Sequence, residues 1–202
     1  ITGTAYDSRL RALIESVSRQ VDRYTNRTFF TLTEARSFDG DGGSLLFVPD
    51  LVAVTSLKED TNADGTLETT WGANDIILIP HNASPTAEWG RPYDCVVVNE
   101  RSNGTQDYFL DGQKNYEITG TWGFRRFTKS SGNTGTLADG TATTVTLSGT
   151  TNLEVLQTLL IDTEQLFVTG IASGTATVER AKNGSTGSAH TGATVNIVEF
   201  PD

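Results

Sequence analysis

The first 27 residues carry a repeating apolar pattern that predicts one long helix. From Thr4 to Arg27 the apolar side chains recur in steps of three and four, which places them on one face of an α-helix. A helix of this length spans on the order of 33 Å, and Asn26 is suited to end it in a left-handed conformation. We expect this helix to cover the strands that follow or to pack against a second copy. The apolar stripe consists of Tyr6, Leu10, Leu13, Ile14, Val17, Val21 and Tyr24.

After the helix, the pattern changes to short alternating runs that predict strands. Residues 35–38 and 44–48 flank the turn at 39–43, which is rich in Gly and Asp, so we expect a hairpin there. The second of these strands is expected to stop at Pro49, and a third is expected at 51–59. Further strands are predicted at 67–71, 75–79, 93–99 and 116–124.

The composition changes near residue 130. Residues 129–133 are rich in Ser and Gly and are interpreted as a linker. Runs rich in Thr, Gly and Val follow at roughly ten-residue spacing, which is typical of a small barrel or sandwich. The predicted fold class is α+β, with one long N-terminal helix and a β-rich domain over 1–129, followed by a small all-β barrel or sandwich module over 130–202. Strands of this module are expected at 143–147, 157–162, 165–169, 175–180 and 193–199.

Composition and charge narrow the function classes. Of the 202 residues 36% are hydrophobic, which is enough for a folded core. The net charge of -10 argues against a surface that binds nucleic-acid phosphates, because such surfaces need an excess of Lys and Arg. The helix is the exception, since five arginines face only three acidic residues in the first 27 positions. These arginines are Arg9, Arg11, Arg19, Arg23 and Arg27.

The cysteine count and the hydropathy indicate the cellular compartment in which the protein acts. Cys95 is the only cysteine, so an internal disulfide is excluded and we expect an intracellular assembly environment. No apolar run reaches the roughly 18 residues of a membrane span, and the N-terminus lacks the pattern of a signal peptide. We therefore expect no membrane partner.

The segment after the third predicted strand matches the opening of a calcium-binding loop. Oxygen-bearing side chains stand at its first, third and fifth positions, and Gly65 stands at the sixth. The twelfth position is Trp71, where the loop needs a bidentate carboxylate, and Glu68 at the ninth does not replace it without rebuilding the loop. An ordinary Asp-Gly hairpin turn is the better interpretation. The weak metal candidates are Asp60, Asn62 and Asp64.

The sequence contains no recognisable catalytic motif. His81 and His190 lie in separate regions without an obvious carboxylate partner in sequence, so a triad or a metal site would depend on long-range contacts. Phosphate-binding loops, nucleophile elbows and zinc motifs are also missing from the sequence. We expect neither an enzyme nor a cofactor.

Three tryptophans offer a second function class. Trp71, Trp89 and Trp122 could line a sugar-binding face. They are dispersed, and Trp122 stands in a strand-like run between glycines, so core packing or subunit contact is the preferred interpretation. A carbohydrate-binding or host-recognition module is the alternative, and exposure of Trp71 and Trp89 would favour it.

The arginines of the helix have two interpretations, which the sequence leaves open. They form either a solvated face or a contact with an acidic neighbouring subunit or partner. In the second case the apolar stripe and its arginine flanks are the subunit or partner interface. This predicted interface consists of Leu10, Ile14, Val17, Val21, Tyr24, Arg9, Arg11, Arg19 and Arg23.

Segments in a fixed order along the chain carry a family resemblance. They are residues 13–29 at the end of the helix, LFVPDLVAV at 46–54 and ITGTWGF at 118–124. Over about residues 5–127 the chain resembles the head-to-tail connector (adaptor, head-completion) proteins of tailed bacteriophages. Residues 135–200 look like a small β module inserted in phage virion proteins of this kind.

This resemblance implies a structural role. Proteins of the family form a ring, commonly twelve-fold, beneath the portal, through which DNA passes without sequence-specific binding and onto which the tail is built. The implied partners are further copies of the chain, the portal protein and tail or neck proteins. The implied location is the head-tail junction of a virion, after synthesis in the host cytoplasm. An acidic ring wall would let DNA slide past.

Overall fold

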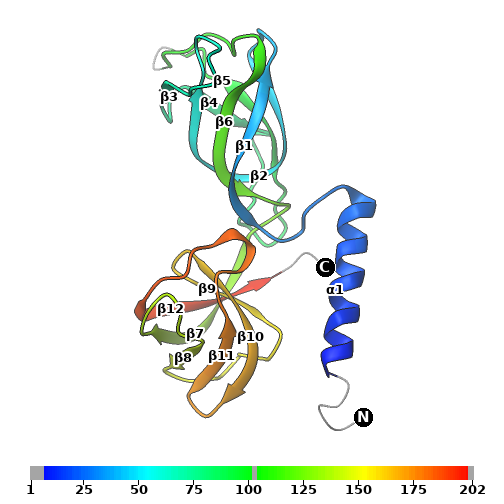
Figure 1. Cartoon of the computed structure of the whole chain (residues 1–202), viewed down its shortest axis with the longest axis vertical. Helices are drawn as coiled ribbons and strands as arrows, with labels where there is room; N and C mark the ends of the chain where they lie inside the picture. The colour runs from blue at the N-terminus through cyan, green and yellow to red at the C-terminus, as the bar shows by residue number, and fades with distance from the viewer. Residues whose placement is uncertain (1–6, 102–103, 200–202) are drawn as a thin grey trace.

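The computed structural model describes residues 7–101 and 104–199, and this part of the chain is mostly β (Figure 1). Strands account for 48% of the structure and helix for 10%. The predicted α+β class with a long N-terminal helix is therefore wrong. The helical pattern forms only the short helix α1 (Asp7–Thr25), of 19 residues. The later elements of the described chain are strands and one 3-10 turn, so β structure dominates the fold. Residues 4–6 of the expected helix lie outside the described residues.

Helix α1 ends at the residue that the sequence indicates. Asn26 has φ 53, the left-handed conformation that stops a helix. The hydroxyl of Thr25 donates to the carbonyl oxygen of Val21 at 2.8 Å, which satisfies one of the carbonyls that a helix end leaves free. Residues 26–31 then lead into the first sheet.

Strands β1 to β6 form an antiparallel sheet in the order β1-β6-β2-β5-β4, with β3 paired to β2. The strand β2 is the longest, so it pairs with β5 along its first half and with β6 and β3 along its second. The strands are β1 (Leu32–Gly40), β2 (Leu45–Glu59), β3 (Thr69–Trp71), β4 (Ile76–Ile79), β5 (Tyr93–Val98) and β6 (Gly112–Trp122).

Two expectations about β1 and β2 are wrong. The hairpin expected across residues 39–43 does not form, because β6 lies between β1 and β2. The strand β2 also continues through Pro49. The pairing of β2 with β5 shifts register between Phe47 and Leu51, so Pro49 sits in an irregularity of the ladder, which is where a strand tolerates proline.

The sheet buries an aromatic core around one acidic group. Trp71 and Phe109 stack at a ring distance of 4.9 Å, and Tyr116 meets both rings edge-on. The carboxylate of buried Glu59 accepts hydrogen bonds from the Tyr116 hydroxyl and, at 2.8 Å, from Nε1 of Trp71. Burial and the hydrogen bond to Glu59 raise the pKa of Tyr116 well above its usual value of 10. The polar ends of these side chains are thus satisfied inside an apolar cluster.

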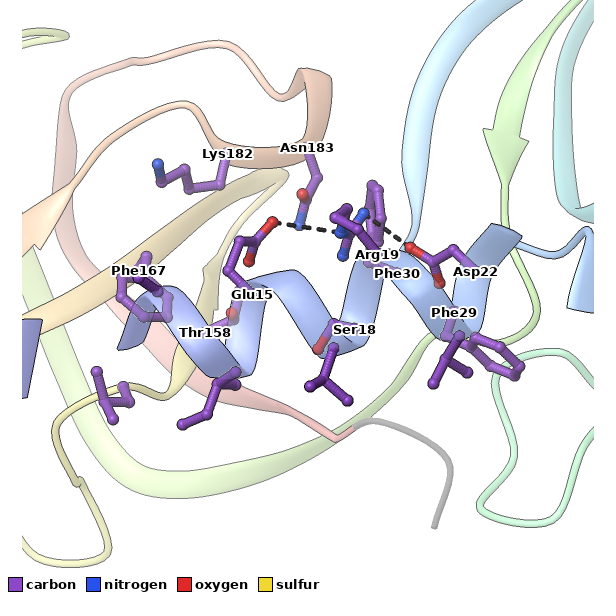
Figure 2. Close-up of a pocket in the computed structure, with 15 residues that line it drawn as sticks. Glu15, Ser18, Arg19, Asp22, Phe29, Phe30, Thr158, Phe167, Lys182 and Asn183 are labelled. Carbon is purple, nitrogen blue, oxygen red and sulfur yellow. Dashed lines mark ion pairs between the residues drawn. The ribbon is translucent and has the colours of Figure 1, made fainter. Parts of the chain in front are cut away.

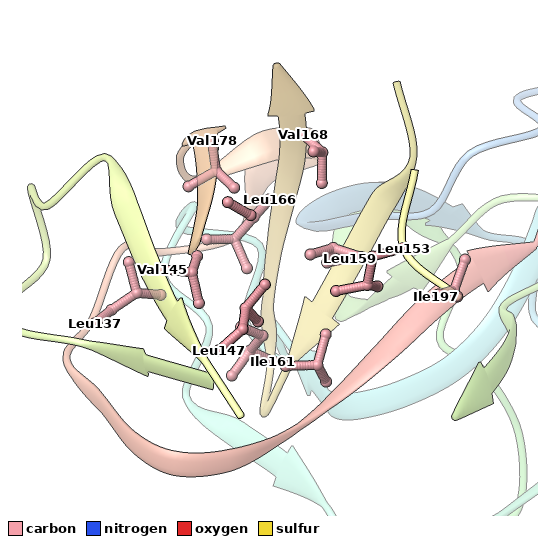
Figure 3. Packing of buried hydrophobic residues seen from close by; sticks show 12 residues of the cluster. Leu137, Val145, Leu147, Leu153, Leu159, Ile161, Leu166, Val168, Val178 and Ile197 are labelled. Atoms are coloured by element: carbon pink, nitrogen blue, oxygen red, sulfur yellow. The ribbon is translucent and has the colours of Figure 1, made fainter. Parts of the chain in front are cut away.

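The second half of the described chain is a closed barrel in the order β10-β11-β8-β7-β12-β9, with β9 paired back to β10 (Figure 3). Alternate residues of each strand point inward, and closure leaves no free strand edge. The inward side chains form a separate core of Leu137, Val145, Leu147, Leu153, Leu159, Ile161, Leu166, Val168, Ala176, Val178, Val195 and Ile197. The strands are β7 (Phe127–Leu137), β8 (Thr144–Leu147), β9 (Thr158–Ile161), β10 (Glu164–Ala172), β11 (Thr175–Glu179) and β12 (His190–Glu199), with the 3-10 turn η1 (Lys182–Gly184) before β12.

The segment expected as a linker is part of this barrel. Residues 129–133 lie within β7, which pairs with β12 and β8. The glycine of this segment, Gly132, has φ +77 and lies where the pairing with β12 shifts register between Val195 and Asn196. Further along β7, a Cβ on Gly135 would lie 2.9 Å from Val145 and 3.0 Å from Val195. Glycine at this position lets the barrel interior fill with larger side chains from the facing strands. Small residues here indicate a tight strand, and the linker interpretation is wrong.

The sheet and the barrel touch directly. Nε2 of Gln165 donates to the carbonyl oxygen of buried Thr31 at 3.2 Å and to its hydroxyl at 3.1 Å. The turn η1 lies against β1, where Gly184 packs on the backbone of Thr33. No helix in the described part of the chain is long and apolar enough to cross a membrane.

Candidate functional site

The apolar stripe of α1 is uncovered. The exposed fractions of its large apolar side chains range from 44% for Val21 to 94% for Tyr24. Six exposed apolar side chains on one helix form a surface that water solvates poorly. The expectation that the helix covers its own strands is thus wrong. The other expectation, that it packs against a second copy of the chain, stays a prediction. The exposed stripe comprises Leu10, Leu13, Ile14, Val17, Val21 and Tyr24.

A polar edge of α1 faces the body instead. In Figure 2, Glu15, Arg19 and Asp22 lie on the side of the helix toward Asn183 of the barrel. Arg19 pairs with Glu15 at 3.2 Å and with Asp22 at 2.8 Å. Its guanidinium also lies 4.4 Å from the ring centroid of Phe30, a cation–π contact. The two ion pairs lie within α1, and the contact with Phe30 joins the helix to the segment that leads into the sheet.

Between α1 and the barrel runs an open groove with a volume of about 1000 Å³. Ile14, Val17 and Val21 line it from the helix, and Leu156 and Phe167 line it from the barrel. Figure 2 draws the side chains that line this space. The helix therefore stands away from the barrel instead of packing on it.

The arginines of the helix differ in their surroundings. Arg9 and Arg23 are exposed and form no ion pair with the described residues, so they are free to meet an acidic partner. Arg19 is used within the chain, as described above. Arg11 lies in α1, but its side chain lies outside the described residues. Arg27, at the end of the helix, pairs with Asp50 at 3.6 Å.

The acidic loop after β2 closes a hairpin, as the sequence indicates. Strands β2 and β3 are antiparallel partners, and Gly65 has φ +87. The buried carboxylate of Asp60 accepts backbone N–H bonds from Asn62, Ala63 and Gly65, at 3.2, 2.7 and 2.8 Å. It therefore serves as the internal brace of the turn.

One expectation about this loop is corrected by its geometry. Ligand atoms of Asp60, Asp64 and Glu68 lie within 4.8 Å of one another, so Glu68 does reach the cluster. However, Glu68 also accepts a hydrogen bond from the backbone N–H of Thr61 at 3.1 Å. The side-chain oxygen of Asn62 accepts a hydrogen bond from the backbone N–H of Asp64 at 3.0 Å. The carboxylates are engaged in holding the loop, and we assign no metal to them.

A charged network at one end of the barrel was not expected from the sequence. Glu164 is fully buried and accepts two hydrogen bonds of 2.7 Å from the guanidinium of Arg180. His190 lies between two carboxylates, with Nδ1 2.7 Å from Asp162 and Nε2 2.9 Å from Glu164. His190 thus has carboxylate partners that its sequence neighbours did not indicate, because β9, β10 and β12 bring distant residues together.

This network also contains the residue types of a hydrolytic triad. The Ser188 hydroxyl lies 3.3 Å from Nε2 of His190, whose Nδ1 faces Asp162. A triad needs Nε2 free to accept the serine proton. Here Nε2 also faces the carboxylate of Glu164 at 2.9 Å, closer than the Ser188 hydroxyl at 3.3 Å. Nε2 is therefore not free for Ser188 alone, and the contacts of His190, Glu164 and Arg180 join residues from several parts of the barrel.

The network predicts a specific pH dependence of stability. Burial alone would raise the pKa of Glu164, but hydrogen bonds from Arg180, His190 and the backbone N–H groups of Ser188 and Ala181 lower it from 4.5 to about 2. A carboxyl whose pKa falls on folding stabilises the protein above its unfolded pKa and loses this contribution as the pH falls through its folded pKa. The free energy of unfolding of the wild type relative to E164Q should thus hold above about pH 5 and shrink by about 2 to 3 kcal/mol toward pH 2.

Urea denaturation of the two proteins at matched pH values measures this difference. Glutamine mimics the protonated carboxyl, so the two proteins should converge in stability at low pH. A difference that stays constant from pH 6 to pH 2 would contradict a lowered pKa of Glu164.

The tryptophans do not gather on one face. Trp122 and Trp71 are buried, at 0% and 5% exposure, and Trp89 is 83% exposed. Nε1 of Trp122 donates to the carbonyl oxygen of Glu34 at 3.0 Å. Core packing is confirmed for Trp71 and Trp122, and a sugar-binding face would have to rest on Trp89 without them.

Comparisons of this chain with protein-family models, with curated proteins and with solved structures found no match.

Proposed function

We propose that this chain is a structural assembly protein whose helix α1 forms the contact between subunits. The observation that carries the proposal is the exposed apolar stripe of α1, which borders an open groove beside the barrel and is not packed against it. Burying it would remove six large apolar side chains from water. A helix that is amphipathic but unburied in its own chain needs a partner to satisfy its apolar side.

We propose further that the assembly is the adaptor ring between the portal and the tail of a tailed bacteriophage, made in the host cytoplasm and located at the head-tail junction. The resemblance of about residues 5–127 to connector proteins supports this, and so does the net charge of -10, which suits a wall past which DNA slides. The ring would act by assembly and sealing, without catalysis. Portal and tail or neck proteins would be its partners.

The test is the mass of the purified protein, alone and with a portal ring, by light scattering and negative-stain imaging. We expect closed rings, formed either by the protein alone or on the portal. A wild type that stays at the 21.7 kDa of one chain in both conditions would overturn the proposal.

A pair of helix variants localises the contact. Val17→Asp with Val21→Asp places two charges in the stripe, and we expect it to abolish ring formation because a buried unpaired charge costs several kcal/mol. Ala12→Asp with Ser16→Asp is the matched control, since it changes the same helix by the same residue type outside the stripe. Circular dichroism should show both variants folded. Rings of unchanged mass from the stripe variant would show that α1 is not the contact.

The second candidate is a carbohydrate-binding or host-recognition module, favoured by the exposure of Trp89. The burial of Trp71 removes one of the two aromatic residues on which it depended. Retention of monomeric protein on a glycan array, lost in Trp89→Ala, would select this candidate over the assembly protein.

A further inference from the structure

A second uncovered apolar surface lies on the sheet, at the opposite side of the molecule from α1. In an antiparallel sheet, directly paired residues share a face. The register pairs Leu45 with Val97 and Phe47 with Cys95 across β2 and β5, and it continues onto β4. One face therefore carries Leu45, Phe47, Cys95, Val97, Ile77 and Ile79. We call this set the β2–β5–β4 face.

This face is apolar although the core lies on the other side of the sheet. Leu46, Val96 and Leu78, the intervening residues of the same strands, pack in the buried aromatic cluster. On the β2–β5–β4 face, Phe47 is 73% exposed and Leu45 is 41% exposed, and these two form its uncovered part. Cys95 is buried, and Val97, Ile77 and Ile79 are half-buried. Strands that are apolar on both faces are typical of sheets covered on both sides. Within the described part of the chain, β4 also pairs with β5 alone, so it forms an open edge of the sheet.

The charges around this face complement those of α1. Residues 41–50 and 75–100, which carry the face, contain six acidic residues and one basic residue. Asp41, Asp94 and Glu100 among them are exposed. Residues 7–27 contain five arginines and three acidic residues, and the rest of the chain contains 10 basic and 22 acidic residues. The helix is thus the basic element, and the sheet end is acidic.

We propose that α1 of one copy docks on the β2–β5–β4 face of a second copy, an inference that rests on the proposed function. The stripe of α1 and the Leu45–Phe47 part of the face are both apolar and exposed, and their charged borders are opposite in sign. The two surfaces of one chain cannot meet, because α1 lies beside the barrel while β4 and β5 lie at the far side of the other half of the molecule (Figure 1). Contact between them joins separate copies.

This pairing determines the kind of assembly. Each copy offers a helix to one neighbour and a sheet face to another, which is a heterologous, head-to-tail contact. Such contacts close into a ring when the rotation per copy allows it, whereas helix-to-helix pairing of two copies is isologous and stops at a dimer. The stripe residues Val17 and Val21 would cover Phe47 and Leu45, and Arg9 and Arg23 would lie toward the acidic border.

Mixing two blocked variants tests the pairing. The first is Val17→Asp with Val21→Asp, which keeps its sheet face, and the second is Phe47→Asp, which keeps its helix. Under the conditions in which the wild type assembles, each variant alone should remain at 21.7 kDa. Mixed in equal amounts, they should form a complex of two chains and nothing larger, because one intact helix meets one intact face. Phe47→Leu, which stays apolar, is the control and should assemble like the wild type.

The outcomes separate this inference from the proposed function. If the wild type forms rings and Phe47→Asp forms the same rings, or if the two blocked variants do not combine, the docking on the sheet face is wrong and the assembly role stands. If the wild type is a monomer with and without the portal, both fail. Because Phe47 is exposed, its replacement should leave the fold intact, and circular dichroism confirms that before the masses are compared.

Discussion

Replacing Arg180 with alanine is expected to lower the free energy of unfolding by about 3 to 5 kcal/mol. The guanidinium donates two hydrogen bonds to Glu164, which is fully buried, and three more to the carbonyl oxygens of Asp139, Ala142 and Ser188. Alanine would leave a buried carboxylate without its counter-ion and three carbonyls without their donor. Removing one partner of a buried ion pair is far more costly than the pair itself is worth.

Lys182→Ala is the matched control in the same segment. Its ammonium pairs with Glu179 at 2.6 Å, but both side chains are about two-fifths exposed, at 39% and 41%. An exposed pair contributes about 0 to 1 kcal/mol, because water screens it. Chemical denaturation followed by circular dichroism compares the two variants. If Arg180→Ala costs no more than Lys182→Ala, the network does not tie the barrel together as described.

The position of this network explains why the sequence did not reveal it. Glu164 and Arg180 meet through the pairing of β10 with β11, and β12, which pairs with β9 beside β10, brings His190 to them from farther along the chain. One local signal was present: Glu164 shares the two-residue period of Leu166 and Val168, both of which point into the core. A charged residue at an inward position of a strand indicates a buried partner.

Helix α1 shows the opposite relation between sequence and structure. The three- and four-residue spacing of its apolar side chains is local, so its existence and its end at Asn26 could be predicted. The direction of its stripe could not, because amphipathicity requires only that some apolar surface covers the helix. Phe47 was missed for a related reason. The run of apolar residues from Leu45 to Val48 reads as a buried strand, although only alternate residues reach the core.

The predicted α+β fold class is wrong because the helix was given too much weight and the composition of β7 was misread. The single helix dominated the expectation because its period was the clearest signal, while β7 was hidden by small residues that resemble a linker. A Cβ on Gly135 would meet Val145, Val195 and Ile161, whereas Gly132 faces open space where the pairing with β12 shifts register. The strand β6 lies between β1 and β2, although it comes later in the sequence. This long-range pairing is not encoded by the turn residues next to β1 and β2.

Replacing Trp122 with alanine is the second change with a large expected effect, a loss of about 3 to 5 kcal/mol in the free energy of unfolding. Its side chain is 0% exposed and packs between β1 and β2, opposite Leu32 and Leu51 in the register. Its ring lies 5.7 Å from that of Phe38, and the guanidinium of Arg36 covers it at 4.6 Å. Alanine would open a cavity lined by these groups and leave the Glu34 carbonyl without its donor.

Trp89→Ala makes the same chemical change at an exposed site and should alter stability by no more than about 0.5 kcal/mol. Urea denaturation of both variants measures the two losses under identical conditions. Equal losses would contradict the placement of Trp122 in the core. The comparison also bears on assembly, because Trp122 holds β1 to β6 beside the segment that attaches α1. If W122A weakens ring formation while Trp89→Ala does not, the position of the helix depends on this end of the sheet, and the stripe works as an interface only when the sheet holds it in place.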